Sequence, residues 1–208
     1  MKQVRGIWLP DEDTHFESHL LKNPWFHDKG TYQYSKLQAA LPLVKRYNMA
    51  FDVGAHVGTW SRVLYHHFAR VVAFEPVSEH VECLRLNAPN VEVKPVAVGA
   101  HTGKCSLTIT PANSGNCRVN GDGQTHMIAL DSLDCEHLDF LKIDVEGYEV
   151  EVLRGGEGII RRTCPVIVIE QKPGNAEQFG FTQFQALDLL LSWGFTVAWH
   201  KSGDYCLV

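Results

Sequence analysis

Carboxylates stand at the ends of four short apolar segments of this 208-residue chain, namely Asp52, Glu75, Asp144 and Glu170. Short apolar runs of this kind are typical of buried strands in an open α/β sheet, where ligands bind outside the carboxyl ends of the strands. A carboxylate can accept hydrogen bonds from hydroxyl groups, pair with cations or take up a proton. These acids are therefore the first candidates for a ligand or catalytic site.

The first acid introduces a glycine loop. Asp52 is followed by Gly54 and Gly58, and an amphipathic stretch begins at Thr59, so the segment predicts a strand, a tight turn and a helix. Glycines let the backbone approach a ligand closely, and Thr59 or Ser61 is suited to capping the helix. The free N–H groups at the helix start favour an anionic group such as a carboxylate or phosphate.

The spacing of the second acid points to a nucleoside. Glu75 lies 21 residues after Gly54, and an acid at about that distance holds a ribose diol in doubly wound sheets. The G-x-G-x-x-G pattern of a dinucleotide site is absent. Asp52 would repel a pyrophosphate but suits ammonium and sulfonium charges. The residues favour S-adenosylmethionine over a dinucleotide. The remaining alternative is that the segment is a glycine turn of an α/β protein and binds no ligand.

A second informative segment holds Asp144 and Glu146, between an apolar strand and a helical stretch that begins at Tyr148. A carboxylate here could serve as a general base toward a hydroxyl group. Glu146 is the first candidate, Asp144 the second and His56 the third. For Glu146, stabilisation by the helix dipole is an equally good explanation.

Lys142 interrupts the apolar strand, and we expect it to pair with Asp144, Glu146 or Glu170 as a buried structural pair. These three acids also offer the oxygen ligands that divalent cations prefer, but we predict no metal site. The six cysteines form no C-x-x-C pair and the 11 histidines lack zinc-ligand spacing. Reduced thiols in a cytoplasmic protein are the expectation.

Composition is that of a soluble globular protein, with 45% hydrophobic and 21% charged residues. The net charge of −5 argues against a broad nucleic-acid-binding surface. No apolar run approaches the roughly 20 residues that span a bilayer. We therefore expect neither nucleic acid nor membrane as a partner.

Strands and helices alternate over most of the chain, which predicts an α/β fold with a mostly parallel sheet and helices on both faces. The predicted strands are 50–53, 71–74, 91–98, 140–143 and 165–170, and the predicted helices are 59–68, 78–87, 148–153 and 181–193. Two last strands, 195–200 and 204–208, predict an antiparallel terminal hairpin. Strands 104–110 and 125–130 enclose a turn-rich loop, 111–124, that is placed to reach the site.

The length suggests a single domain. Residues 1–48 are expected to form an arm and a helix, 30–47, that cover the ligand cleft, with Pro42 interrupting the helix. Residues 49–208 form the ligand-binding domain. In the 111–124 loop, Asn113 and Asn116 could touch a ligand, but turn formation explains them adequately.

Together these motifs resemble the FkbM-type S-adenosylmethionine-dependent methyltransferases, over residues 51–170. The resemblance rests on four segments of the chain, Phe51-Asp52-Val53-Gly54-Ala55-His56-Val57-Gly58, Ala73-Phe74-Glu75-Pro76, Pro95-Val96-Ala97-Val98-Gly99 and, most specifically, Leu130-Asp131-Ser132-Leu133 followed by Phe140 to Glu149. It implies a Rossmann-like class I methyltransferase fold and methylation of a hydroxyl group, often on a sugar or natural product, and hence a small-molecule or glycan acceptor. This chain has His56 where the family usually has Asn. The first 45 residues and the terminal hairpin fall outside the core that the family shares, so the resemblance places the choice of substrate there and in the 111–124 loop.

The resemblance also implies how the cofactor and its product, S-adenosylhomocysteine, would be held. Glu75 would bind the ribose hydroxyls, Val98 would flank the adenine, and Asp144 would close the methionine side. The implied cofactor-binding residues are Asp52, Gly54, Ala55, His56, Gly58, Thr59, Trp60, Glu75, Pro76, Val98 and Asp144. Two alternatives stay open: a methyltransferase that acts on a macromolecule, and a catalytically silent nucleoside-binding module.

Overall fold

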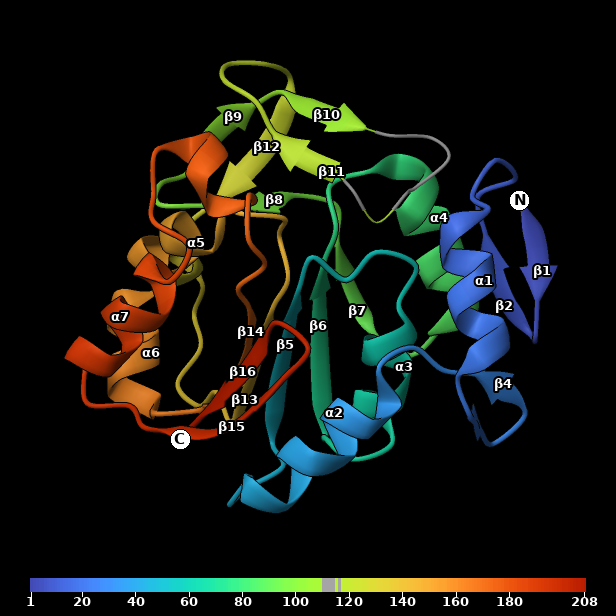
Figure 1. The fold of residues 1–208 in the computed structure, drawn as a ribbon, viewed down its shortest axis with the longest axis horizontal. Coiled ribbons are helices and arrows are strands. Elements are labelled where there is room, and N and C mark those ends of the chain that lie inside the picture. The colour runs from blue at the N-terminus through green and yellow to red at the C-terminus, as the bar shows by residue number, and fades with distance from the viewer. Residues whose placement is uncertain (110–114, 116) are drawn as a thin grey trace.

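A seven-stranded sheet forms the centre of the protein (Figure 1) in a computed structural model that describes residues 1–109, 115 and 117–208. The strand order is β15-β16-β14-β13-β5-β6-β7. The five strands from β14 to β7 are parallel, and β16 is antiparallel to both of its neighbours. The strands are β5 (Met49–Val53), β6 (Arg70–Phe74), β7 (Glu92–Lys94), β13 (Phe140–Ile143), β14 (Val166–Glu170), β15 (Val197–Lys201) and β16 (Asp204–Leu207). The predicted mostly parallel sheet and terminal hairpin are confirmed.

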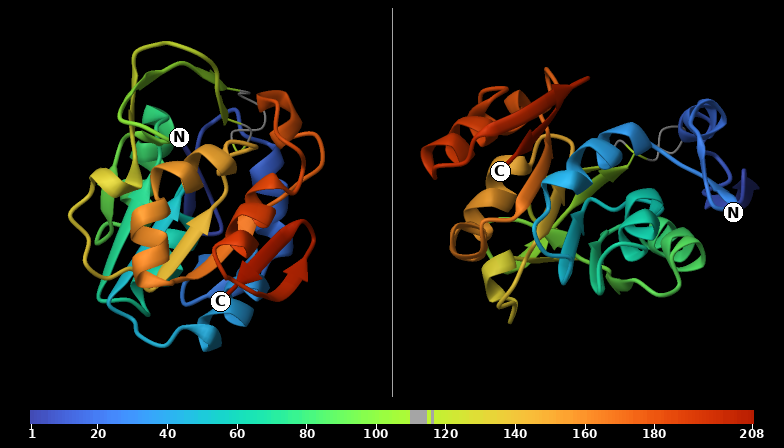
Figure 2. Two further views of the ribbon diagram at one scale, coloured as in Figure 1. Left: turned by 90° about the vertical axis from the view of Figure 1, so that its left-hand side faces the viewer. Right: turned by 90° about the horizontal axis from the view of Figure 1, so that it is seen from below.

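Helices cover both faces of this sheet (Figure 2). One layer holds α2 (Tyr34–Ala40), α3 (Thr59–Tyr65) and α4 (Ser78–Asn87), and the other holds α5 (Glu149–Gly155), α6 (Glu157–Thr163) and α7 (Gln185–Ser192). Alternate residues of β5 face the two helix layers, because neighbouring side chains of a strand point to opposite faces of the sheet. Ala50 belongs to the same hydrophobic cluster as Trp60 of α3, whereas Phe51 belongs to the cluster that contains Val150 of α5.

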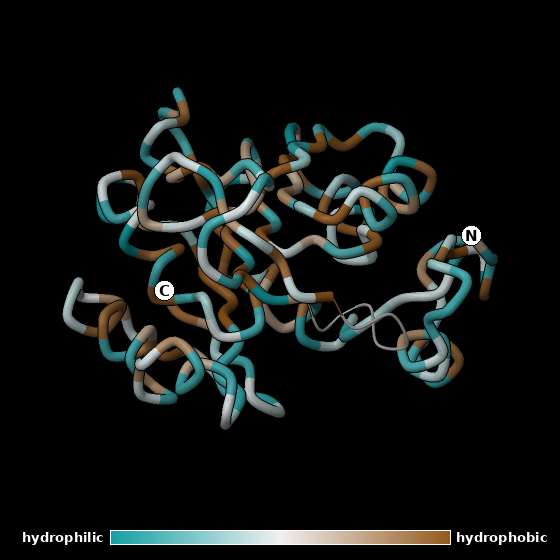
Figure 3. The backbone as a smooth tube through the Cα atoms, turned by 90° about the horizontal axis from the view of Figure 1, so that it is seen from above, coloured by the Kyte–Doolittle hydropathy of each residue, from teal (hydrophilic) through white to brown (hydrophobic). Residues whose placement is uncertain are grey.

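Hydrophobic residues gather in the central strands between the two helix layers (Figure 3). Helix α7 is shorter than predicted and starts at Gln185. Leu187 and Leu190 of this helix are buried, whereas Phe184 and Leu191 are exposed. In the residues that the structure describes, none of the helices is long and apolar enough to cross a membrane.

Small sheets lie over the carboxyl ends of the parallel strands (Figure 1). One contains β8 (Ala97–Val98), β9 (Gly103–Cys105) and β12 (Thr125–Ile128), and the other pairs β10 (Leu107–Ile109) with β11 (Cys117–Val119). The single strand predicted over 91–98 is wrong: β7 and β8 belong to different sheets, and Pro95 between them has no N–H to donate to a ladder. Strand β11 was not predicted, and Asn113 and Asn116 lie outside the described residues.

The N-terminal arm has more regular structure than the sequence indicated. It contains β1 (Lys2–Val4), β2 (Ile7–Leu9), α1 (His15–Lys22), β3 (Trp25–Phe26) and β4 (Lys29–Gly30). Asn87 of α4 anchors it by exchanging hydrogen bonds with the backbone of Trp8, and Phe16 and Leu20 pack against Val57. Helix α2 ends at Ala40 before a 3₁₀ turn, Leu41–Leu43, so the predicted interruption at Pro42 is confirmed.

Candidate functional site

The glycine loop presses against the end of β13. Gly54 has φ +76°, and a Cβ on it would lie 1.8 Å from the carbonyl oxygen of Asp144, so a larger residue does not fit. Gly58, with φ +83°, takes the N-cap position of α3 that was predicted for Thr59 or Ser61. The Ser61 hydroxyl instead donates to Asp52 Oδ2 at 2.6 Å. The loop therefore joins the ends of β5 and β13, where the strand order of the sheet reverses.

Glu75, at the end of β6, is held by backbone and side-chain donors. The His56 N–H donates to Oε2 at 2.8 Å and the Val77 N–H to Oε1 at 3.0 Å. His80 Nδ1 lies 3.1 Å from Oε1. Burial opposes ionisation of Glu75, but its contact with His80 holds its pKa below the usual value. The carboxylate is therefore charged and fixed in orientation.

His56 connects this carboxylate to the N-terminal arm. Its ring packs edge-on against His80, at 4.6 Å between centroids, and against Phe16 of α1, at 4.7 Å. Burial first, and then the charge of His80, lowers the pKa of His56 to about 3. A histidine with so low a pKa is a weak base at neutral pH, so His56 is the least suited of the three predicted bases.

A first cavity, called here the Glu75 cavity, opens between the strand ends and the small sheets. Its walls include predicted cofactor residues from β5, β6, β8 and β13, together with His80 and Cys117, which were not predicted. The predicted residues on its walls are Gly54, His56, Glu75, Pro76, Val98, Asp144 and Glu146. The cavity thus has an acid suited to a ribose diol, together with apolar side chains such as Val96 and Val98 that suit a flat base.

Lys142 forms a buried ion pair between β13 and β5. Its Nζ lies 3.3 Å from Asp144 Oδ2 and 3.5 Å from Asp52 Oδ1. Burial opposes the charge on Lys142, but Asp144 and Asp52 hold its pKa above the usual value; burial likewise opposes the charge on Asp144, and Lys142 keeps that pKa low. The expected structural pair of Lys142 with Asp144 is confirmed, and Asp52 is a second partner that was not predicted.

Glu146 does not serve as the helix-terminal carboxylate. It precedes α5 with φ +54°, and its Oε2 accepts a hydrogen bond from Asn175 Nδ2 at 2.9 Å. Glu149 takes the terminal role, since its Oε1 accepts from the N–H groups of Val145 and Gly147 at 3.2 and 3.1 Å. Burial raises the pKa of Glu149 to about 7. Burial, and then the charge of Asp144, also raises the pKa of Glu146, which makes it a stronger base than an ordinary carboxylate.

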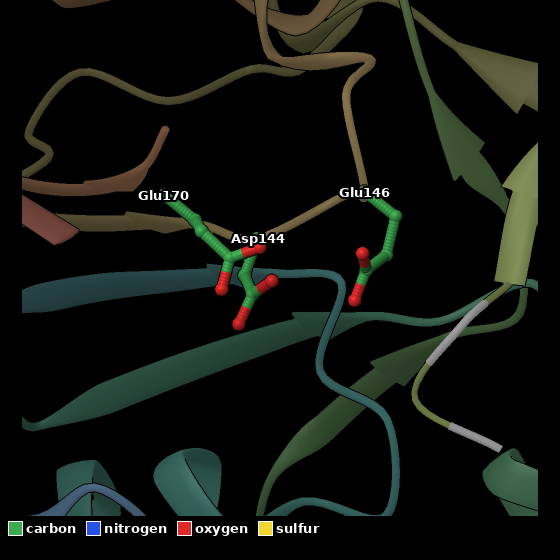
Figure 4. Close-up of side chains that lie close together, drawn as sticks. All are labelled: Asp144, Glu146 and Glu170. Carbon is green, nitrogen blue, oxygen red and sulfur yellow. The ribbon is translucent and has the colours of Figure 1, made fainter. Parts of the chain in front are cut away.

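Asp144, Glu146 and Glu170 come together at the carboxyl ends of β13 and β14 (Figure 4), with oxygen atoms within 4.8 Å of one another. Such a group has the right atoms for a divalent cation. Two lysines already form ion pairs with these carboxylates: Lys142 pairs with Asp144, and Lys172 Nζ lies 2.6 Å from Glu170 Oε1. Burial first, and then the charge of Asp144, raises the pKa of Glu170, whereas the ion pair with Lys172 opposes this rise. The absence of a metal therefore stays a prediction.

A second cavity, called here the Arg118 cavity, adjoins the first. Its walls come from α1, from the glycine loop, from β11 and from the segment after β14, and they carry Arg118, Lys142 and Lys172. The predicted residues on its walls are Gly54, His56, Thr59, Trp60, Asp144 and Glu146. Five residues line both cavities, namely Gly54, His56, Gly115, Asp144 and Glu146. Two ligands bound side by side would therefore meet at the predicted bases.

The remaining predicted residues, Asp52, Ala55 and Gly58, are buried in the strand and loop behind these walls. Asp52 has no exposed surface, so its contacts run to Lys142 and Ser61. Sequence reasoning missed His80, Glu149, Arg118 and Lys172. Of these, His80 had a signal, because it lies in the first turn of a helix that directly follows Glu75. Arg118 had none, because its position depends on a strand that was not predicted.

Comparison with known proteins supports one family. The family model described as the methyltransferase FkbM domain matches residues 52–197. No curated protein matches the sequence. The matched range contains both glycines of the loop, all the acids of the site and Arg118.

Solved structures of methyltransferases share the fold at low sequence identity. Methyltransferase FkbM from Methylobacillus flagellatus is 18% identical with a TM-score of 0.53, over 77% of this chain and 43% of that one. A putative methyltransferase from Streptococcus mutans, solved in complex with S-adenosylhomocysteine, is 14% identical with a TM-score of 0.51, over 84% and 94%. A ribosomal protein L11 methylase from Lactobacillus delbrueckii is 10% identical with a TM-score of 0.51, over 89% and 87%. These similarities show the class I methyltransferase fold.

Proposed function

Because the chain belongs to the FkbM methyltransferase family, we propose that it transfers the methyl group of S-adenosylmethionine to a hydroxyl group of a sugar or another small molecule. The observation that carries the proposal is the wall that the Glu75 and Arg118 cavities share. It allows a methyl donor and an acceptor to lie next to each other at the predicted base, which is the arrangement that a two-substrate transfer requires.

The Glu75 cavity fits the nucleoside part of the cofactor. Glu75 is charged, fixed by His56 and His80, and suited to accept hydrogen bonds from ribose hydroxyls. Val98 lies on the wall where an adenine would stack. Thr59 and Trp60 line the adjoining Arg118 cavity at the start of α3, so the methionine part of the cofactor would have to extend from the Glu75 cavity to face them. When bound, the cofactor supplies a sulfonium-activated methyl group.

Glu146 is the proposed general base. It lines both cavities, its pKa is raised, and Asn175 holds one of its carboxylate oxygens. Its role is to take the proton of the acceptor hydroxyl as the oxygen becomes a nucleophile. Asp144 is the weaker candidate because Lys142 holds its pKa low. Its proposed role is to orient Lys142 and to close the methionine side of the cavity.

Incubation with methyl-labelled S-adenosylmethionine and a panel of sugars, glycans and hydroxylated natural products tests this proposal. We expect label to be transferred to an oxygen of at least one small acceptor, and no label in added RNA or DNA. Transfer to nucleic acid or protein alone would contradict the proposed acceptor class, and would favour a macromolecular methyltransferase.

A further inference from the structure

Arg118 stands apart among the cations of the Arg118 cavity. Lys142 is paired with Asp52 and Asp144, and Lys172 is paired with Glu170. Over residues 1–109, 115 and 117–208, Arg118 has no carboxylate at ion-pair distance, and its Nη1 donates to the neutral amide oxygen of Gln178. Glu146 is near enough for Arg118 to lower its pKa, without forming an ion pair.

The guanidinium group of Arg118 also has a buried hydrogen-bond donor without an acceptor. Arg118 Nε is inaccessible to solvent, and no group in the described part of the chain accepts its hydrogen bond. Trp60 Nε1, on a second residue of the same cavity wall, is in the same state. Buried donors without acceptors cost free energy. Both atoms lie behind the cavity surface, so the feature that points to a ligand is the unpaired positive charge of Arg118 on the cavity wall.

The geometry of a guanidinium group narrows the kind of acceptor. Its N–H groups form a planar fork that matches a carboxylate or phosphate, with two parallel hydrogen bonds to one anion. A neutral hydroxyl would satisfy one donor but would leave the charge unpaired. With a cationic methyl donor in the neighbouring cavity, the local potential would favour an anion further.

We propose that the Arg118 cavity binds an acceptor that carries an anionic group, a carboxylate or a phosphate, beside the hydroxyl that is methylated, and that Arg118 pairs with this group. The inference rests on the proposed methyltransferase function and names the chemical class of its acceptor. Arg118 reaches the cavity from β11, whereas Thr59 and Trp60 line it from the start of α3.

Calorimetric titration of protein saturated with S-adenosylhomocysteine tests the proposal with three probes: glucose, glucuronate and glucose 6-phosphate. We expect at least one anionic probe to bind about tenfold or more tightly than glucose, as one charge-assisted hydrogen-bonded pair provides. The two anionic probes separate a carboxylate site from a phosphate site. Arg118→Gln should abolish the preference and Arg118→Lys should keep part of it. Arg85→Gln, which removes an exposed arginine of α4, should leave it unchanged.

Three results would overturn the inference. The first is equal binding of charged and neutral probes, or no binding of either anion, by the wild-type protein. The second is an anion preference that persists in Arg118→Gln. The third is a loss of S-adenosylhomocysteine affinity in Arg118→Gln, since Arg118 would then pair with the carboxylate of the cofactor. Failure of S-adenosylhomocysteine to bind the wild-type protein would instead refute the proposed function itself.

Discussion

The two cavities of the site are lined by different parts of the chain. The Glu75 cavity is built largely from loops that directly follow β5, β6 and β13, and backbone N–H groups fix its central carboxylate. The Arg118 cavity joins α1 of the arm, β11 of a small sheet and the segment after β14. Its charges are set by side-chain pairs rather than by the backbone.

This difference explains how one fold can keep a cofactor and change its acceptor. The Glu75 cavity depends on the ends of the strands and on a loop that packs too closely against Asp144 for any residue but glycine at position 54. Substitutions there would therefore disturb the sheet itself. The acceptor side depends on segments that can vary without altering the sheet. We therefore expect variants of the shared wall and the Glu75 cavity to have the largest effects on cofactor and turnover.

The shared wall gives the largest expected effect. Glu146→Gln keeps the shape of the side chain and removes the base, so kcat should fall by about 100- to 1,000-fold. Affinity for S-adenosylmethionine should stay within about twofold, because the oxygen that Asn175 contacts is retained. Steady-state kinetics and calorimetry measure the two effects, with the exposed Glu136→Gln as control. A wild-type kcat in Glu146→Gln would remove Glu146 from the proposed role.

Glu75→Ala tests the cofactor side alone. The variant loses the partner of the ribose hydroxyls and the carboxylate to which the His56 and Val77 N–H groups donate. We expect the Kd of S-adenosylmethionine to rise by about 100-fold. Glu79→Ala, an exposed acid in the first turn of α4, is the matched control. Unchanged affinity in Glu75→Ala would refute the ribose assignment.

Glu149 tests whether the loop under the shared wall is held by a buried acid. Because burial raises its pKa to about 7, the folded state binds this proton more tightly than the unfolded chain. Its contribution to stability is complete at low pH and is lost as pH rises through about 7. Glu149→Gln keeps the acceptor oxygen but has no proton to lose. Between pH 5 and pH 8, the free energy of unfolding of the wild type should therefore fall by about 2 kcal/mol more than that of Glu149→Gln. Denaturant unfolding at both pH values measures this difference, and parallel curves for the two proteins would contradict it.

His80 should have a smaller effect, because it acts on the cofactor through Glu75. His80→Ala removes the Nδ1 contact with Glu75 but leaves the two backbone donors in place. We expect the Kd of S-adenosylmethionine to rise by about tenfold, with part of the affinity restored in His80→Asn. The exposed His137→Asn serves as control. Equal losses in His80→Ala and His80→Asn would indicate a packing role alone.

Metal removal should have the smallest effect of all. Since Lys142 and Lys172 already pair with Asp144 and Glu170, we expect methyl transfer in excess EDTA to stay within about twofold of its rate in magnesium. Loss of activity in EDTA and its recovery with a divalent cation would show instead that the three carboxylates bind a metal ion.

The sequence predicted the Glu75 cavity better than the Arg118 cavity for a physical reason. Gly54, Glu75 and Asp144 follow apolar runs, and the carboxyl ends of parallel strands meet at one edge whatever the rest of the chain does. Arg118 and Lys172 reach the site through tertiary contacts that leave no periodic pattern. The cap predicted at Thr59 or Ser61 failed because a buried acid, Asp52, competes for the Ser61 hydroxyl.

Calorimetric titration with S-adenosylmethionine, S-adenosylhomocysteine and NAD tests the central claim most directly, because it needs no knowledge of the acceptor. The arrangement of Glu75, the glycine loop and Asp144 predicts micromolar binding of both adenosyl ligands and no binding of NAD. Binding of NAD, or silence from all three ligands, would contradict a methyltransferase site, and silence would point first to His56, which stands where the family usually has Asn.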